Sequence, residues 1–248
     1  MKSCETDKSK SDVNSARLFT LADIGVTRGT KNILSDINLS IRSGEKIVFT
    51  GSSGSGKTTL LTLLAGGVKP DSGILKLRGD TIGRSNLHIL RRIGAFIQQE
   101  PVFSGETVME MVNLPFSFRI NRFHGSTVEK EAHESERLNN LHELLELLSL
   151  PQSILKERPS TLSGGEKQRL CIIRALLMNR ETIFADEITS ALDALSRKRI
   201  MELILSSTAT VISVSHDNEW IEKCHRKIKL HNGRISEDIH IRFTENKS

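Results

Sequence analysis

In the first quarter of the sequence, eight consecutive residues have the types and the spacing that bind phosphate groups. Residues 51–58 (GSSGSGKT) fit the pattern G-x-x-x-x-G-K-[ST], with an expected strand before them and an expected helix after them. Their glycines let backbone N–H groups turn toward phosphate oxygens, and the helix N-terminus adds its positive dipole end. Lys57 would reach the β- and γ-phosphates, and the Thr58 hydroxyl would bind Mg²⁺. The residues expected to contact the nucleotide here are Gly51, Ser52, Ser53, Gly54, Ser55, Gly56, Lys57, Thr58 and Thr59.

A second set of small polar residues is also suited to an anion. Ser163, Gly164 and Gly165 stand just before residues 167–178, where the sequence predicts a helix. A hydroxyl and unblocked N–H groups then gather at the positive end of a helix dipole. Taken alone, these residues could equally be an ordinary helix cap, because serine is a preferred N-cap residue. Their position downstream of the phosphate-binding loop favours the anion site.

The order of the motifs resembles that of the ATP-binding subunits of ABC transporters. Residues 162–169 (LSGGEKQR) match the signature motif of that family, with Glu166 in the place of Gln. Residues 182–187 (TIFADE) resemble its Walker B strand and two acids, and residues 190–193 (SALD) resemble its D-loop. The resemblance covers about residues 18–235 and implies an ATPase that uses ATP and Mg²⁺.

The resemblance also implies a role for each of the remaining polar residues. Asp186, at the end of its strand, would hold Mg²⁺ or its water together with Thr58. Glu187 would be the base that orients and deprotonates the attacking water. His216 resembles the switch histidine that contacts the γ-phosphate, and Asp193 resembles the D-loop acid that reaches across a dimer interface.

The glutamine of the Q-loop is one of two neighbours in residues 93–101 (IGAFIQQEP). Counting forward from Ile93 selects Gln98, whereas counting backward from Pro101 selects Gln99. We favour Gln98, both as a catalytic residue and as a Mg²⁺ ligand. In the family this glutamine joins the nucleotide site to the helical subdomain, where the surface receives a coupling helix from the membrane partner.

The sequence departs from the family where many members have an aromatic residue that stacks on adenine. Residues 24–29 (IGVTRG) contain no aromatic residue, and the whole chain has no Tyr. Val26 could pack against the base, or Arg28 could stack its planar guanidinium on it. We therefore expect weak discrimination between bases, and the preference for ATP over GTP follows from the resemblance alone.

The elements that must position these groups alternate between strands and helices. Residues 33–41 show a period of two, which places Ile33, Ser35, Ile37, Leu39 and Ile41 on one face of a half-buried strand. Strands are expected at residues 18–26, 33–41, 46–50, 74–77, 93–97, 182–185 and 210–215, and helices from near Lys57 and at residues 138–150, 167–178 and 192–205. This alternation predicts a mainly parallel sheet.

The expected fold is therefore α/β. It is a P-loop NTPase sandwich with a mainly parallel sheet core, an antiparallel N-terminal β subdomain and an inserted helical subdomain at about residues 100–160. Residues 1–17 are interpreted as a disordered tail, and residues 18–248 as a single ATP-binding domain. Within the insertion, residues 119–135 are expected to form a charged connection.

Composition places the chain among soluble globular proteins. Its 248 residues are 37% hydrophobic and carry a formal charge of +5, which is too small to indicate nucleic-acid binding. No apolar stretch approaches the roughly 20 residues that span a bilayer, and the first residues do not form a secretory signal. Three cysteines without paired spacing (Cys4, Cys171 and Cys224) indicate free thiols in a reducing compartment.

The function implied by the resemblance is that of an ATPase subunit that energises transport through a separate integral membrane permease. Two copies, or a pseudo-dimer, would close head to tail around two ATP molecules, at the cytoplasmic face of the inner membrane. Residues 186–193 (DEITSALD) with residues 113–116 (NLPF) look most like export ATPases of the bacterial iron-efflux type. The alternative is a non-transport ABC ATPase that acts as a switch on ribosomes or DNA. A P-loop kinase would leave the signature motif unexplained.

Overall fold

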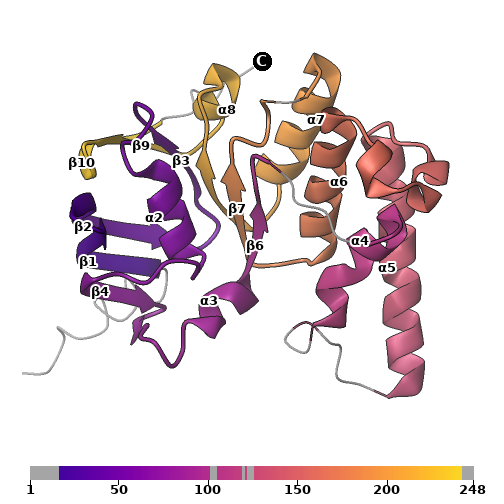
Figure 1. Ribbon diagram of the computed structural model, residues 1–248, viewed down its shortest axis with the longest axis horizontal. Helices are drawn as coiled ribbons and strands as arrows, with labels where there is room; N and C mark the ends of the chain where they lie inside the picture. Colours follow the sequence, from indigo (N-terminus) through magenta and orange to yellow (C-terminus); the bar gives the residue numbers. More distant parts are fainter. Residues whose placement is uncertain (1–16, 101–104, 119–120, 122–125, 191, 242–248) are drawn as a thin grey trace, which may run out of the picture.

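The computed structural model describes residues 17–100, 105–118, 121, 126–190 and 192–241, and it contains two β-sheets and flanking helices (Figure 1). One sheet has four antiparallel strands in the order β2-β1-β4-β5, and the other has six in the order β10-β9-β3-β8-β7-β6. The strands are β1 (Arg17–Arg28), β2 (Lys31–Arg42), β3 (Lys46–Thr50), β4 (Ser72–Leu77), β5 (Asp80–Thr81), β6 (Gly94–Ile97), β7 (Thr182–Asp186), β8 (Thr210–Val214), β9 (Arg226–His231) and β10 (Arg234–His240).

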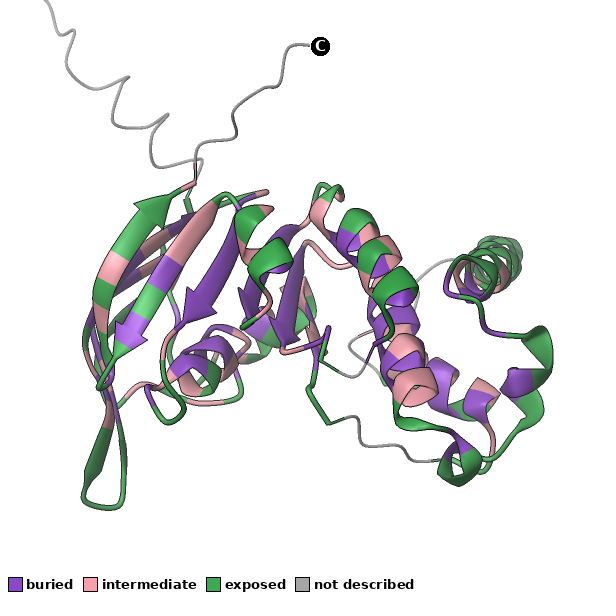
Figure 2. Cartoon of the chain, turned by 90° about the horizontal axis from the view of Figure 1, so that it is seen from above, coloured by how far each residue is buried: buried purple, intermediate pink, exposed green. Residues whose placement is uncertain are grey.

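The six-stranded sheet is the centre of the molecule. Its strands β9, β3, β8, β7 and β6 run parallel, and β10 joins the edge as an antiparallel hairpin partner of β9. Every residue of β3, β7 and β8 is buried. Figure 2 shows the strands at the centre of the molecule in purple, the colour of buried residues. These short runs are rich in β-branched and apolar residues because both faces of the sheet are covered.

Two hydrophobic cores lie on opposite faces of this sheet. In β3, Ile47 and Phe49 pack with the antiparallel sheet, α2 (Lys57–Leu64) and α3 (His88–Ile93). Val48 instead belongs to the core that contains the remaining helices. These helices are α4 (Val108–Ser117), α5 (Thr127–Leu147), α6 (Gly164–Leu177), α7 (Ala194–Leu205) and α8 (Asn218–Glu222), with 3₁₀ turns η2 (Gln152–Lys156) and η3 (Pro159–Thr161). The mixed α/β architecture predicted from the sequence is confirmed.

The helical segment between β6 and α6 begins its long helix earlier than the sequence pattern predicted. Residues 119–135 were expected to form a connection, but α5 already starts at residue 127. Ser126 caps it, and Glu129 bonds back to the Ser126 N–H, so a complete capping box fixes the start. The first half of α5 is exposed and rich in charged residues. These residues hide the apolar period of about 3.6 residues by which a helix is recognised in a sequence.

The pairing of β1 with β2 contains four register shifts, and the simple alternation missed those at Asp23 and Asp36. Asp23 and Asp36 each adopt a φ of 53°, and the register shifts between the pairs on either side of them. The bulge at Asp36 moves Leu34 into the core and leaves Ile33 partly exposed. The prediction that Ile33 and Ser35 share a face with Ile37 is therefore wrong.

The chain ends of the described part lie on the sheets. Arg17, expected to be the last residue of a tail, is the first residue of β1 and pairs with Arg42, whereas residues 1–16 lie outside the described residues. At the other end, Arg226 of β9 holds Asp238 of β10 through two bonds of 2.6 Å. Those bonds lower the pKa of the Asp238 carboxyl.

Two of the three cysteines lie in the described part of the chain. Cys171 and Cys224 are free and buried, and burial raises the pKa of Cys224 to about 12, so both stay protonated as apolar packing groups. Cys4 lies outside the described residues.

Candidate functional site

The loop between β3 and α2 depends on glycine at both ends. Gly51 has a φ of 135°, and a Cβ atom there would lie 2.2 Å from the carbonyl oxygen of Leu230 in the neighbouring strand β9. Gly56, the N-cap of α2, has a φ of 102°. No side chain caps α2 and no acid occupies its first turn, so its free N–H groups remain available to an anion.

Lys57 lies at the centre of this loop. Its side chain is largely buried, and its Nζ donates to the carbonyl oxygens of Gly51 at 2.8 Å and Ser52 at 2.9 Å. The Lys57 ammonium group therefore stabilises the curved conformation of the loop through these two hydrogen bonds. A positive charge fixed at this position, beside open N–H groups, is suited to binding a phosphate chain.

Thr58 and Asp186 meet beside the loop. Strands β3 and β7 are both parallel to β8 between them, so their carboxyl ends lie at one edge of the sheet. The Thr58 hydroxyl donates to Asp186 Oδ1 at 3.4 Å. Burial raises the pKa of the Asp186 carboxyl, while the Thr58 bond and the charge of Lys57 oppose that rise. A hydroxyl and a desolvated carboxylate at this separation are a donor pair that suits Mg²⁺.

Glu187 follows directly and turns toward two other strand ends. Its backbone adopts a φ of 48°, and its N–H donates to the carbonyl oxygen of Val214, the last residue of β8. One carboxylate oxygen lies 3.6 Å from His216 Nε2, and the other accepts from Gln99 Nε2 at 3.3 Å. The ends of β6, β7 and β8 thus bring together an amide, a carboxylate and an imidazole.

The two neighbouring glutamines have different surroundings. Both line an adjoining groove with Thr58 and Asp186, and Gln99 Nε2 also donates to the Glu187 carboxylate. The backbone carbonyl of Gln98 also accepts from Gln168 Nε2 at 3.4 Å, which links it to α6. The sequence favoured Gln98 for both proposed roles; in the structure both glutamines line the groove that contains Thr58 and Asp186, and Gln99 also contacts the Glu187 carboxylate.

The loop, Gln99, Glu187 and His216 surround one cavity of about 350 Å³, whereas Asp186 and Gln98 line the adjoining groove. Six of the nine loop residues predicted from the sequence line it, whereas Gly51, Ser52 and Ser55 do not, and Ser55 is buried. The lining consists of Lys31, Ile33, Ser53, Gly54, Gly56, Lys57, Thr58, Thr59, Gln99, Glu187 and His216. The volume lies within the range of small-molecule sites, near its lower end.

Sequence reasoning missed two residues of this cavity. Lys31 and Ile33 of β2 form its wall beside the loop. Val26, one of two residues suggested to contact a base, is 2% exposed and belongs to the core, so that suggestion is wrong. Arg28, the other, is exposed at the end of β1. The bulge at Asp36 turned Ile33 outward, and no pattern in the sequence indicated that bulge.

The signature residues stand at the start of α6. Helix α6 begins at Gly164, three residues earlier than predicted, because Ser163 is its N-cap and forms a capping box with Glu166. Gly164 and Gly165 are therefore the first helical residues, and their N–H groups belong to the open first turn. Neither Ser163 nor these glycines line the cavity at the loop.

Asp193 caps a different helix. Its Oδ1 accepts from the backbone N–H of Ser196 at 2.9 Å at the start of α7, and these bonds to Ser196 lower the pKa of its carboxyl. Its other oxygen lies 3.3 Å from Arg169 Nη1 of α6. The contacts join the starts of α6 and α7, and 57% of the Asp193 side chain stays exposed.

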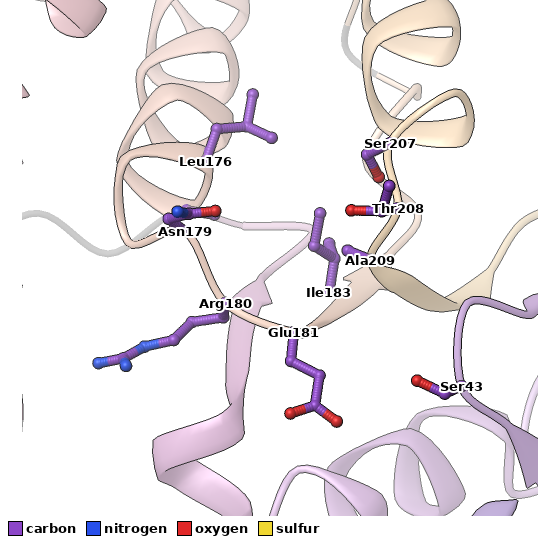
Figure 3. A pocket seen from close by; sticks show the side chains of 10 residues that line it. Ser43, Leu176, Asn179, Arg180, Glu181, Ile183, Ser207, Thr208 and Ala209 are labelled. Atoms are coloured by element: carbon purple, nitrogen blue, oxygen red, sulfur yellow. The ribbon is translucent and has the colours of Figure 1, made fainter. Parts of the chain in front are cut away.

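A second cavity of about 390 Å³ lies at the opposite, amino-terminal edge of the parallel strands (Figure 3). Ser43, Asn179, Glu181 and Thr208 are among its lining residues, and none of the predicted site residues is. Glu181 is paired with Arg78 at 2.5 Å. The predicted loop residues, Glu187 and His216 therefore gather at the first cavity, and Asp186 and Gln98 at the groove beside it.

Comparison with known proteins connects the chain with one family. Residues 34–190 match the ABC transporter family. The chain is 34% identical over 226 residues to the probable iron export ATP-binding protein FetA of Escherichia coli K12, covering 89% of this chain and 95% of FetA. It is 35% identical to a probable ABC transporter ATP-binding/permease protein of Haemophilus influenzae, covering 91% of this chain and 40% of that longer relative.

Solved structures show the same fold. The chain superposes with a TM-score of 0.76 and 28% identity on the ATP-binding cassette MJ0796, in a dimeric post-hydrolysis state bound to ADP and Pi. The match covers 91% of this chain and 99% of that one. Among the described residues, no helix of the present structure has both the length and the apolar character needed to cross a membrane.

Proposed function

The chain belongs to the ABC transporter family of ATPases, and from this premise we propose that it binds ATP and Mg²⁺ and hydrolyses ATP to drive a separate membrane permease. The observation that carries the proposal is the single cavity in which Lys57, Glu187 and His216 meet. A phosphate-binding loop alone would fit many nucleotide-binding proteins. A carboxylate and an imidazole facing that loop suit hydrolysis of the terminal phosphate.

The loop binds the triphosphate in this proposal. The Lys57 ammonium and the first N–H groups of α2 take the β- and γ-phosphate oxygens, so Lys57 exchanges its bonds with Gly51 and Ser52 for stronger, charge-assisted ones. Thr58, Asp186 and Gln98 would hold Mg²⁺, and the metal would supply positive charge that neutralises the phosphates.

Glu187 acts as the base. Its carboxylate accepts the proton of the water that attacks the γ-phosphorus, and the bond to the β–γ bridging oxygen breaks as the new P–O bond forms. Gln99 and His216 approach the two carboxylate oxygens and fix their direction. His216 also contacts the γ-phosphate. Lys31 and Ile33 provide an aliphatic wall against which the adenine of ATP packs, in place of an aromatic ring.

A second copy completes the site in this proposal. Ser163, Gly164 and Gly165 do not line the cavity of their own chain, although their N–H groups and hydroxyl suit an anion. Two subunits arranged head to tail would place each signature against the γ-phosphate held by the other, with Asp193 near the interface. The dimeric state of the MJ0796 cassette supports this arrangement. Hydrolysis removes these contacts and opens the dimer.

The partner and the cargo are inferred from relatives. FetA is named as a probable iron export protein, and the Haemophilus relative carries a permease part in its own chain. We therefore propose a polytopic membrane permease as partner, a position at the cytoplasmic face of the inner membrane, and export of a metal such as iron as the transported activity. We do not propose nucleic acid as a partner of this chain.

The test is purification of a tagged Glu187→Gln variant from detergent-solubilised membranes with ATP and Mg²⁺, followed by identification of the proteins that co-elute. The expected result is a stoichiometric polytopic membrane protein. Recovery of ribosomal proteins, or of a soluble dimer without a membrane partner, would contradict the transport role. Iron content of cells lacking the chain, compared with cells carrying Glu187→Gln or the unchanged chain, then tests the cargo.

A further inference from the structure

The signature serine uses its hydroxyl proton within its own chain. Ser163 Oγ donates to Glu166 Oε2 at 2.7 Å, and the Ser163 N–H donates to the same oxygen at 2.8 Å. In return, Ser163 Oγ accepts from the Glu166 N–H at 3.3 Å. A serine hydroxyl has only one proton to donate. While these bonds exist, Ser163 has no proton left for a phosphate oxygen.

Glu166 also brings a negative charge to this place. The bonds from Ser163 and the nearby charge of Arg169 lower the pKa of the Glu166 carboxyl, so it is ionised at neutral pH. It lies in the first turn of α6, beside the open N–H groups of Gly164 and Gly165. A carboxylate at a helix start stabilises that helix. It also competes for the donors that an incoming phosphate would need.

We propose that Glu166 is a positioning residue that keeps the signature of the free subunit closed to phosphate and thereby weakens ATP-driven dimerisation. Resting on the head-to-tail dimer described above, this role requires the γ-phosphate of the partner's ATP to displace the Glu166 carboxylate from the Ser163 hydroxyl. The Ser163 hydroxyl then rotates from one anion to the other. Each dimer contains two signatures, each facing a γ-phosphate. The repulsion between the Glu166 carboxylate and the γ-phosphate therefore acts twice.

A neutral replacement separates the charge from the cap. In Glu166→Gln, the side-chain amide oxygen can still accept from the Ser163 N–H, because glutamine also forms capping boxes. The negative charge is gone, and an amide N–H group becomes available to the phosphate. Removing one like charge at contact range of the phosphate should tighten the ATP-bound dimer at least about tenfold.

The chain provides a matched control in α5. Ser126 and Glu129 form the same capping box, with the Ser126 N–H and hydroxyl each donating to Glu129 Oε2 at 2.8 Å. Glu129 lies in the helical segment and does not line the cavity at the loop. Glu129→Gln therefore reproduces the loss of charge from a capping box without touching the signature.

The experiment measures the dimer dissociation constant by sedimentation velocity at saturating ATP and Mg²⁺, in a Glu187→Gln background that prevents turnover. Glu166→Gln should lower this constant about tenfold or more relative to the background, and Glu129→Gln should leave it unchanged. If the background protein dimerises with ATP but both glutamine variants match it, the role of Glu166 is wrong and the proposed dimer stands. A background protein that stays monomeric with ATP overturns both.

Thermal unfolding of the two variants without ATP guards against a purely structural effect. Both should lose a similar, small amount of stability, because each weakens one equivalent cap. A tighter dimer in Glu166→Gln together with matched unfolding supports the proposal. If the two variants tighten the dimer equally, general loss of negative charge is the cause and the proposal fails.

Discussion

At the scale of single residues, the Glu187 carboxylate is the group whose removal should separate binding from chemistry. Glu187→Gln keeps the side-chain shape but cannot accept a proton at neutral pH. ATP binding should be retained, because Lys57 and the first turn of α2 are unchanged, while turnover should fall about 100-fold or more. Steady-state ATPase assays beside equilibrium binding of a labelled nucleotide would check this.

Near-normal turnover in Glu187→Gln would remove Glu187 from the role of base. Gln98→Ala and Gln99→Ala should then be compared in the unmutated chain. The contact between Gln99 and Glu187 predicts a lower turnover for Gln99→Ala. The place of Gln98 beside Thr58 and Asp186 predicts a higher Mg²⁺ requirement for Gln98→Ala.

The pair of Arg226 and Asp238 should make part of the stability depend on pH. The pKa of Asp238 is lowered in the folded protein from an ordinary value near 3.8, chiefly by bonds from Arg226. The stabilisation is therefore complete above that ordinary value and is lost as the pH falls through the lowered one. Asp238→Asn should cost on the order of 1 kcal/mol at pH 7, since the pair is partly exposed.

Urea unfolding of Asp238→Asn and the unchanged chain at pH 7 and at progressively lower pH would test that prediction. The difference in unfolding free energy between the two proteins should shrink as the pH falls below about 3.8. A difference that stays constant over this range would show that Asp238 contributes through packing and not through its charge.

At the scale of elements, the loop between β3 and α2 is held by contact with β9. A methyl group at Gly51 would collide with the Leu230 carbonyl oxygen. Gly51→Ala should therefore displace the loop from β9 and weaken ATP binding strongly. Gly79→Ala is a matched control, because Gly79 also has a positive φ (90°) but nothing lies within 4 Å of an added Cβ.

The unfolding free energy of the control should fall only by about 1–2 kcal/mol, which is the cost of placing an alanine in the left-handed conformation. The control should bind ATP normally. Calorimetric titration with ATP and urea unfolding of both variants would measure the two effects. Equal ATP affinity in the two variants would show that the loop tolerates a shift at Gly51.

The sequence was most informative where an element is buried on both sides. The runs that became β3, β7 and β8 were recognisable because each is a short stretch of mostly apolar and β-branched residues, with Ser213 of β8 as a polar residue inside a run. It was least informative at bulges and helix starts. The left-handed turns at Asp23 and Asp36 reverse the alternation without any glycine to mark them, and the capping boxes lengthen α5 and α6 beyond their apolar stripes.

For the site, the motifs identified the loop, the two acids and the histidine, because each follows a strand whose end had to lie at the same edge of the sheet. The sequence did not predict the direction in which each side chain of the site points. Two adjacent glutamines follow β6, and only the structure shows that Gln99 contacts Glu187. Likewise, Lys31 and Ile33 reach the cavity through a hairpin whose register the pattern did not indicate.

At the scale of the whole molecule, the proposed head-to-tail dimer leads to a prediction about mixtures of variants. Lys57→Ala disables the loop, and Ser163→Arg blocks the signature, so each variant alone should be nearly inactive. A mixed dimer combines the intact loop of one subunit with the intact signature of the other. Equal mixing should therefore restore about a quarter of the normal active sites.

ATPase assays on the separate variants and on their mixture would measure this recovery. Activity in the mixture that equals the sum of the separate variants would contradict a shared site. Mixing Lys57→Ala with unchanged protein serves as a control for exchange of subunits.

The sheet order has a consequence for how the chain is made. Strand β3 lies between β8 and β9, both of which follow it by most of the length of the chain. A ribosome adding about 5–20 residues per second needs roughly ten to thirty seconds to deliver them. Throughout that time β3, the strand that carries the nucleotide loop, has neither neighbour in its sheet. Newly made chains therefore present an apolar strand with both edges open, and the ATPase centre forms only after β8 and β9 have been synthesised.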